Sequence, residues 1–516
     1  MFTIKFVGRI KGRKRVILDM TTMQNENNFI ERFISATNLY PDNIAYEIEG
    51  YGIKYTFSQC QREIEIWKGY FETLNVKQGD KVFVLLSNEA EFIFSFYALT
   101  SIGAVSAFYD VKATDYELNK VLEDFDPDGI VTSRKYIETR EFIIDNKSLK
   151  YVLFKDSTDG INTGFWKTQK IEVSSLPKIP QKLTPPADDA IISCHFTYKG
   201  LGYPLQVRHK YNDYSMFLEQ ALKMYPQEPG STHLVCLPYY PIYGISSSVI
   251  FPLATGCRLL TCTDFYKRNL LEMLVENNVS FVCFVPLLLK KLAHEAYLEK
   301  ESMVKRLNPS LVIISGGSYL EESIEEDIYK YIGIMVYDGY GLTETFPITF
   351  NYKNNVRFGT VGSANEQYMN IIIVNHNGEN LKRGMVGEIA VKGCTISDGY
   401  FGKDEVTSEL FKDGYFYTGD IGFFDNEDYL HFVGRKYPIT KVTSKMVDLT
   451  EIENLIKSYS GIINARAIVK ENKKLGEIVF LYLKSTNNKL TEKEVKNIFR
   501  NCLSKHKIPS KIIISS

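Results

Sequence analysis

A short segment, residues 338–345, brings an aromatic ring, hydroxyl groups and carboxylates together in the order Asp-Gly-Tyr-Gly-Leu-Thr-Glu-Thr. The ring of Tyr340 can stack on a nucleobase, and the hydroxyl group of Thr343 can donate to a phosphate oxygen. The carboxylate of Glu344 is the hard oxygen ligand that Mg²⁺ prefers. These groups predict a nucleoside triphosphate site, whereas a turn with Thr343 as a helix N-cap is the structural alternative.

A second carboxylate stands in residues 417–420, which read Tyr-Thr-Gly-Asp. The carboxylate of Asp420 can accept hydrogen bonds from both hydroxyl groups of a ribose. Arg435 follows soon after and can add a second polar contact to the sugar or the phosphate. Thr-Gly-Asp is also common in turns, so this motif alone does not decide between a sugar site and a turn.

A third motif, Ser315-Gly316-Gly317, directly follows an apolar run that is typical of a strand. Open α/β sheets bind ligands at the carboxyl ends of their strands. Glycines at such a point let a flat ring lie against the backbone. A tight turn between a strand and a helix is the structural alternative.

The elements that must position these motifs are those of an α/β fold with mostly parallel sheets, because strand and helix patterns alternate from about residue 26. Residues 321–332 have the pattern of a helix with an acidic first turn. Short, continuous apolar runs, typical of strands buried on both faces, occur at residues 82–86, 234–237, 280–285, 311–314 and 332–337.

The pattern changes after about residue 432, where a small α+β unit follows the large body. Residues 448–458 and 491–503 have helical patterns, and residues 465–469 and 478–483 have strand patterns. The connection at residues 434–438, Gly-Arg-Lys-Tyr-Pro, suits a hinge. We therefore expect a basic N-terminal extension (1–25), a large domain (26–433) and a small mobile lid (434–516).

Composition excludes several classes of protein. A net charge of −1 gives no field that would attract nucleic acid. No stretch of about 18 continuous apolar residues occurs, so we expect no membrane span. The eight cysteines contain no Cys-x-x-Cys pair, which favours a reducing, cytoplasmic location. The basic start of the chain is expected to be a flexible extension, or to precede a true start at Met20 or Met23.

The motifs, taken in order, resemble the adenylate-forming superfamily of acyl-CoA synthetases, peptide-synthetase adenylation domains and luciferases. The resemblance covers roughly residues 40–510, and its ordered set is far more specific than any single motif. The matching segments are residues 55–57, 79–82, 103–105, 237–244, 315–317, 340–344, 387–389, 417–420 and 434–435.

The resemblance implies that a carboxylate attacks the α-phosphate of Mg-ATP and that the acyl-adenylate then passes to a thiol. The cofactors implied are ATP and Mg²⁺, with coenzyme A or a phosphopantetheinyl acyl carrier protein as acceptor and a small carboxylic acid as substrate. Thr343 and Glu344 would be catalytic, Glu344 as the metal ligand, and Tyr437 would be the hinge. Nucleotide-binding positions would be Thr197, Gly202, Gly316, Gly317, Asp338, Gly339, Tyr340, Asp420 and Arg435.

The expected substrate wall comprises Tyr240, Tyr243 and Gly244, in a segment whose aromatic character suits an aryl or acyl chain. Ordinary core packing is the structural alternative for these aromatic residues. These residues do not identify the carboxylic acid that is the substrate, and they do not distinguish coenzyme A from a carrier protein as the acceptor.

Two departures from the family pattern concern the adenylation step. In the phosphate loop at residues 196–205, Thr197, Gly202 and Pro204 match, but the closing lysine is Leu205, which leaves Lys199 and Arg208 as candidate sources of positive charge. The family's C-terminal catalytic lysine also has no counterpart before the last residue, Ser516. We expect the nearby Lys505, Lys507 and Lys511 to be surface residues.

These departures keep three interpretations open. The first is an active ligase that makes an acyl thioester. The second is a degenerate protein of the same fold that binds a nucleotide or an acyl-adenylate. The third is an enzyme that takes its lysine from a partner polypeptide, or that runs only the thiol half-reaction.

Overall fold

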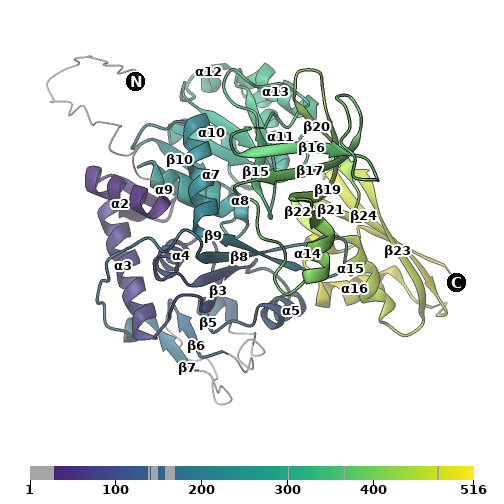
Figure 1. Cartoon of the computed structure of the whole chain (residues 1–516), viewed down its shortest axis with the longest axis horizontal. Coiled ribbons are helices and arrows are strands. Elements are labelled where there is room, and N and C mark those ends of the chain that lie inside the picture. Colours follow the sequence, from purple (N-terminus) through teal and green to yellow (C-terminus); the bar gives the residue numbers. More distant parts are fainter. Residues whose placement is uncertain are drawn as a thin grey trace.

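The computed structural model describes residues 28–137, 140, 149–156, 169–299, 301–364, 366–472, 476–487 and 489–515. The basic extension expected at residues 1–25 lies outside this part of the chain. The described residues build two large sheets, an antiparallel sheet and a smaller C-terminal unit (Figure 1). The fold is α/β with mostly parallel large sheets, as the sequence predicted.

The first large sheet has seven strands in the order β7-β6-β5-β3-β4-β8-β9 and is parallel except for the β8–β9 pair at its edge. Strands β4, β5 and β6 are buried at every position, which explains their continuous apolar sequences. The strands are β3 (Lys81–Leu85), β4 (Val105–Phe108), β5 (Gly129–Thr132), β6 (Tyr151–Phe154), β7 (Gln169–Glu172), β8 (Ile191–Thr197) and β9 (Leu205–Lys210). The helices in the N-terminal stretch of the chain are α2 (Phe29–Leu39), α3 (Phe57–Thr73), α4 (Ala90–Ile102), α5 (Asp115–Phe125), α6 (Arg134–Ile137) and α7 (Tyr211–Met224).

The second large sheet has eight strands in the order β15-β14-β13-β12-β10-β11-β1-β2, and its interior pairs are parallel. Its strands are β1 (Ile44–Ile48), β2 (Ile53–Thr56), β10 (Thr232–Val235), β11 (Arg258–Thr261), β12 (Val279–Phe284), β13 (Val312–Ser315), β14 (Val336–Leu342) and β15 (Phe346–Phe350). The helices are α8 (Ile242–Gly244), a π-helix (Ile245–Ile250), α9 (Phe251–Ala254), α10 (Leu270–Glu276), α11 (Pro286–Leu298), α12 (Glu301–Val304) and α13 (Glu322–Ile332).

A five-stranded antiparallel sheet follows in the sequence. Its strands are β16 (Met369–Val374), β17 (Gly387–Gly393), β18 (Phe411–Lys412), β19 (Tyr415–Phe424) and β20 (Leu430–Arg435), and helix α14 (Asp404–Leu410) precedes β18. The β19–β20 register places Asp420 directly opposite Arg435. Strand pairing thus joins two residues that the sequence predicted to share one ligand.

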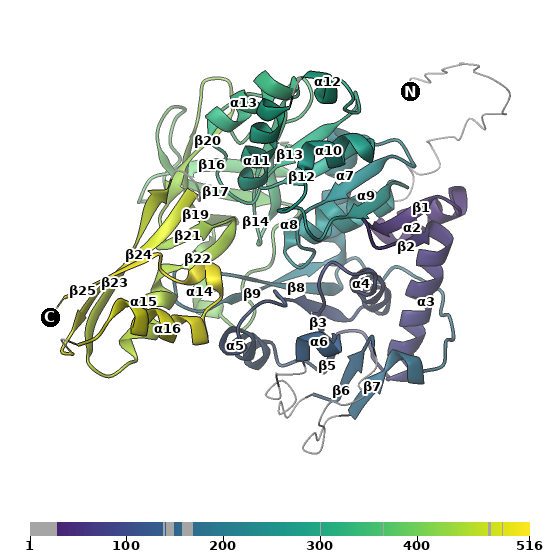
Figure 2. The same cartoon turned by 180° about the vertical axis from the view of Figure 1, so that it is seen from behind.

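The C-terminal unit, defined here as the described residues from 439 to 515, has a hydrophobic cluster of its own around Ile452, Leu481 and Phe499. Both views show it at the side of the molecule opposite α2 and α3 (yellow against purple in Figures 1 and 2). The domain boundary at residue 433 and the mobility of this unit stay predictions. Its elements are β21 (Ile439–Val442), β22 (Lys445–Asp448), α15 (Leu449–Lys457), β23 (Ile462–Asn472), β24 (Gly476–Ser485), α16 (Glu492–Cys502), a 3₁₀ turn (Lys505–Lys507) and β25 (Lys511–Ser515).

Several helix starts agree with the sequence because their capping residues are local signals. Thr56 forms a capping box at α3, Asp448 caps α15 and Thr491 caps α16. Across the described ranges, none of the helices is both long and apolar enough to cross a membrane.

The strand expected at residues 332–337 is placed differently. Helix α13 continues through Ile332 and ends at Gly333, which adopts a φ of 78°. Strand β14 then begins at Val336 and continues to Leu342, so that Tyr340 belongs to the strand itself. A glycine in the left-handed region ends a helix efficiently, and this feature overrode the apolar pattern.

Candidate active site

A cavity of about 760 Å³ opens between the two large sheets and the C-terminal unit. Loops at the carboxyl ends of β3, β4, β8, β10, β13 and β14 form much of its wall, as expected for open α/β sheets. The β21–β22 hairpin and the 3₁₀ turn of the C-terminal unit contribute the remaining side. The predicted residues on the wall are Thr197, Tyr240, Tyr243, Gly244, Gly316, Gly317, Gly339, Tyr340, Thr343, Asp420 and Arg435.

The carboxylate of Asp420 lies at a junction of polar groups on this wall. The hydroxyl group of Tyr340 donates to Oδ2 of Asp420 at 2.8 Å, and Nε of Arg435 lies 3.4 Å from Oδ1. Both Tyr340 and Asp420 are buried. The structure therefore brings together the residues predicted to flank adenine and to hold ribose.

A small adjoining cavity of about 40 Å³ shares Gly317, Gly339 and Tyr340 with the large one. Asp338 lies on its wall, which places this predicted residue beside the large cavity rather than on it. Burial raises the pKa of Asp338 well above its usual range. Phe432 and Tyr319 also line this small cavity, and sequence reasoning missed both because they belong to no motif.

Glu344 is enclosed by protein groups. The Nζ atom of Lys199 lies 3.0 Å from Oε1 of Glu344, and the hydroxyl group of Tyr400 donates to the same oxygen at 2.6 Å. The Lys199 and Glu344 side chains are 4% and 1% exposed. Sequence reasoning named Lys199 as a source of charge but did not predict this pairing, and it missed Tyr400.

A Mg²⁺ ion does not fit this arrangement of Glu344. Oε1 already accepts two strong contacts, and the ammonium neutralises the carboxylate that would attract a dication. Oε2 has no hydrogen-bond partner among the described residues, yet the ammonium beside it would repel a metal ion bound there. Nor do three or more His, Cys, Asp or Glu side chains gather into a metal site anywhere in the described chain.

The phosphate loop contacts the C-terminal unit. The backbone N–H of Gly202, which we expected to face a phosphate, instead donates to Oδ2 of Asp448 at 3.0 Å. A side chain at Gly200 would collide with the ring of Pro438, only 2.6 Å from its Cβ. In this arrangement the N–H of Gly202 therefore binds the C-terminal unit, and the role of Gly202 toward a phosphate stays a prediction.

The ring of Tyr437, the predicted hinge residue, lies against the backbone of Gly419. A Cβ atom at Gly419 would come 2.2 Å from this ring. Gly419 also has a φ of 76°, which a side chain would strain. The connection between β20 and β21 is thus fitted tightly to the segment that carries Asp420.

Close backbone approach also explains two glycines near Tyr243. A Cβ atom at Gly244 would lie 1.8 Å from the carbonyl oxygen of Pro238. The ring of Tyr243 lies against Gly316, whose Cβ would be 3.2 Å from it. This part of the cavity is aromatic and apolar; its further lining residues include Phe217, Ala221, Tyr225, Phe251, Phe281, Val285, Phe346 and Phe350.

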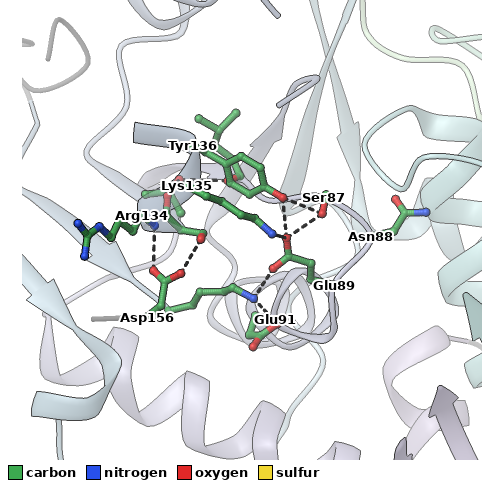
Figure 3. A network of polar contacts seen from close by, with 12 residues as sticks. Ser87, Asn88, Glu89, Glu91, Arg134, Lys135, Tyr136 and Asp156 are labelled. Atoms are coloured by element: carbon green, nitrogen blue, oxygen red, sulfur yellow. Dashed lines mark hydrogen bonds and ion pairs between the residues drawn. The ribbon is translucent and has the colours of Figure 1, made fainter. Parts of the chain in front are cut away.

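A polar network supports the part of the cavity wall that includes Ser87 and Tyr136 (Figure 3). The Oε1 atom of Glu89 accepts from Ser87, Lys135 and Tyr136 at 2.6–2.8 Å, and Lys155 forms an ion pair with the same carboxylate. Burial alone would raise the pKa of Glu89, but the hydrogen bonds outweigh it and lower the pKa to about 2. The network thereby fixes the loop after β3.

Asn88, in the same loop, connects the two large sheets. Its Nδ2 atom donates to the carbonyl oxygen of Leu237 at 2.7 Å, and its Oδ1 atom accepts from the N–H of Tyr239 at 2.8 Å. These two bonds hold the segment that leads into the aromatic wall. Sequence reasoning gave no role to Asn88, because the partners belong to a distant part of the chain.

Lysines of the C-terminal unit reach the cavity. Lys441 of β21 donates from Nζ to the carbonyl oxygen of Gly317, and burial, with Arg435 next in effect, lowers its pKa to about 7. Lys507 is only 3% exposed and bonds to Tyr198, Glu117 and Glu451. The expectation that Lys507 lies on the surface is therefore wrong, whereas Lys505 and Lys511 are exposed as expected.

Comparison with known protein families identifies the chain. A family model described as AMP-binding enzyme matches residues 33–401, which is well over half of the sequence. The chain belongs to the AMP-binding enzyme family. It is thus an adenylate-forming ligase, and the family implies that it uses ATP.

Curated relatives of this family member include a 4-coumarate–CoA ligase from Vanilla planifolia, 24% identical over 82% of the chain and 78% of the relative. A 2-succinylbenzoate–CoA ligase from Oceanobacillus iheyensis is 24% identical over 92% of the chain and 93% of the relative. Among solved structures, o-succinylbenzoate CoA synthetase from Bacillus subtilis superposes with a TM-score of 0.79 at 20% identity, covering 94% of each chain. The amide bond synthetase McbA from Marinactinospora thermotolerans gives 0.82 at 20%, covering 95% of each chain. At these identities the structural likeness concerns the fold.

Proposed function

We propose that this enzyme activates a small carboxylic acid with ATP and transfers the acyl group to the thiol of coenzyme A. The observation that carries the proposal is the continuity of one cavity, which joins the polar group around Asp420 to the aromatic wall around Tyr243. A nucleotide and an apolar acid can therefore meet in one enclosed space. The curated relatives named above, which are CoA ligases, support coenzyme A rather than a carrier protein as acceptor.

In the first half-reaction, a carboxylate oxygen of the acid attacks the α-phosphorus of ATP, and the bond to the β-phosphate oxygen breaks to release pyrophosphate. In the second, the thiol sulfur attacks the acyl carbon, AMP leaves, and the thiol proton passes to solvent. We assign adenine stacking to Tyr340, ribose binding to Asp420 and Arg435, and an α-phosphate contact to Thr343. Such positioning of reactants is the main contribution that a protein makes to this chemistry.

Magnesium enters this scheme as part of the Mg-ATP substrate. The assignment of Glu344 as its ligand requires Lys199 to give up Oε1, which the buried ion pair opposes.

We also propose that the C-terminal unit turns about Tyr437 between the half-reactions. All eight cysteines are free, which supports a reducing location such as the cytoplasm.

The acid is proposed to carry a neutral aryl or acyl chain. The described residues around Tyr243 are mainly aromatic or aliphatic, and the polar ones in its own segment, Ser246 and Ser247, carry no charge. Burying a charged substituent against such a wall would be costly without a partner.

ATP–pyrophosphate exchange over a panel of aryl, fatty and amino acids tests the proposal. We expect exchange with at least one aryl or fatty acid, and CoA-dependent release of AMP with the same acid. Exchange should fall sharply in Asp420→Asn and change in Glu344→Gln. AMP binding without exchange for any acid would indicate a binding protein, and turnover of pre-made acyl-AMP without exchange would indicate an enzyme of the second half-reaction.

A further inference from the structure

The turn between β8 and β9 departs from the family pattern in the position of its lysine. Thr197 pairs with Leu205 across the two strands, and Leu205 is the position at which the family pattern has a lysine. Leu205 is fully buried in an apolar cluster with Val207, Ile348 and Ile389. A lysine stands instead at position 199, in the turn between the two strands.

The side chain of Lys199 is held from three sides. Its Nζ atom lies 3.0 Å from Oε1 of Glu344 and donates to the carbonyl oxygen of Thr418 at 3.1 Å. The ammonium also lies over the ring of Phe416, 5.0 Å from the centroid. Thr418 is only two residues from Asp420, so Lys199 joins the Glu344 carboxylate to the segment that carries the ribose-binding candidate.

We propose that Lys199 is a built-in cation that replaces a divalent metal ion at Glu344 and supplies a fixed positive charge to the nucleotide cavity. The proposal rests on the proposed nucleotide site. Lys199 itself lines the cavity, whereas Glu344 does not. An ammonium is a compact point charge that suits phosphate oxygens, and its burial keeps the charge strong.

A purely structural ion pair is the competing explanation, and it makes different predictions. A buried ion pair gives a protein little more stability than apolar residues of similar shape would. Stability alone therefore does not explain well why Lys199 and Glu344 occupy these positions. If the pair were only structural, replacing both partners by neutral residues would leave nucleotide affinity unchanged. If Lys199 binds the nucleotide, removing the charge of Lys199 must lower the affinity for nucleotide.

Binding of Mn²⁺, followed by electron paramagnetic resonance without nucleotide, tests the metal half of the proposal. The wild-type protein and Glu344→Gln should bind equally little Mn²⁺. Lys199→Met should gain a Mn²⁺ site, because it leaves the Glu344 carboxylate without a cation, and Lys199→Met/Glu344→Gln should lose that gain. Mn²⁺ binding to the wild type that disappears in Glu344→Gln would overturn the proposal, as would a folded Lys199→Met that gains no site.

Affinity for a non-hydrolysable ATP analogue in EDTA, measured by calorimetry, tests the nucleotide half. The neutral pair Lys199→Met/Glu344→Gln avoids an uncompensated buried charge and should fold even where a single variant does not. We expect it to bind the analogue about tenfold or more weakly than wild type, since a charge-assisted bond is lost. Equal affinity would overturn the proposal.

Lys210→Met is the matched control, because Lys210 belongs to the same hairpin and its ion pair with Asp398 lies at the surface. It should leave both readouts unchanged. Neither experiment requires an acid substrate. Failure of acid activation in the wild type would therefore reject the proposed function without touching this proposal, and failure of these binding tests would reject Lys199 alone.

Discussion

The Nζ atom of Lys507 in the C-terminal unit lies 2.7 Å from Oε1 of Glu117 on helix α5, which packs against the first large sheet. Both side chains are almost fully buried, at 3% and 2% exposure. The same ammonium lies 2.8 Å from Oε2 of Glu451 and 3.0 Å from the hydroxyl group of Tyr198. One lysine therefore binds the C-terminal unit, the phosphate loop and the first sheet together.

Replacing Lys507 by methionine should loosen the docking of the C-terminal unit. The substitution leaves two buried carboxylates without their cation, which typically costs about 3–5 kcal/mol. Urea unfolding and limited trypsin digestion should show a lower midpoint and faster cleavage within residues 439–515. Lys505→Met is the control, because Lys505 is exposed and its loss should change stability by about 0.5 kcal/mol or less. Equal behaviour of the two variants would contradict the buried cluster.

Asp420→Asn should weaken AMP binding while preserving the shape of the site. The carboxylate is buried beside Tyr340 and Arg435, where a charge-assisted bond to a sugar hydroxyl typically contributes about 1.5–3 kcal/mol. We therefore expect a loss of about tenfold or more by calorimetry. Asp413→Asn, which changes an exposed aspartate shortly before the same motif, should bind AMP like wild type. An unchanged affinity in Asp420→Asn would remove Asp420 from the ribose site.

Glu89→Gln should alter the acid limb of the stability profile. The folded-state pKa of about 2 lies below the ordinary value of 4.5, so the carboxylate stabilises the protein above pH 4.5 and this contribution is lost as pH falls toward 2. The contribution at neutral pH is on the order of a few kcal/mol. Urea unfolding across this pH window should show lower neutral stability and a flatter acid limb for the variant. Glu123→Gln, on the exposed face of α5, should follow the wild-type profile, and a parallel profile for Glu89→Gln would refute the network's contribution.

Ser444→Gly should stabilise the protein. Thr443 and Ser444 connect β21 to β22 with φ angles of 49° and 64°, the left-handed region that both central residues of such a two-residue turn occupy. A glycine avoids a steric cost of roughly 1 kcal/mol there. Ser444→Ala, which also removes the hydrogen bond to Ser318 but keeps Cβ, separates the backbone effect from the loss of the hydroxyl group. The glycine variant should melt above the alanine variant, and the reverse order would refute the strain.

The sequence predicted those features that depend on local signals. The caps Asp448 and Thr491 placed two helices within a residue of their observed starts, and the motif order led to Tyr340 and Asp420. It could not predict the burial of Lys507, because the lysine's partners come from three distant segments. The pairing of Lys199 with Glu344 could not be predicted for the same reason. Hydrophobic periodicity indicates where a helix or strand lies, but not which charged side chains it will contact.

The burial of Leu205 and the ion pair of Lys199 with Glu344 have a consequence for substitutions in the β8–β9 hairpin. Restoring a lysine at position 205 alone would bury a second ammonium in an apolar cluster while Lys199 still neutralises Glu344. Removing Lys199 first would leave Glu344 without its cation. Each of these single substitutions is therefore expected to destabilise the protein.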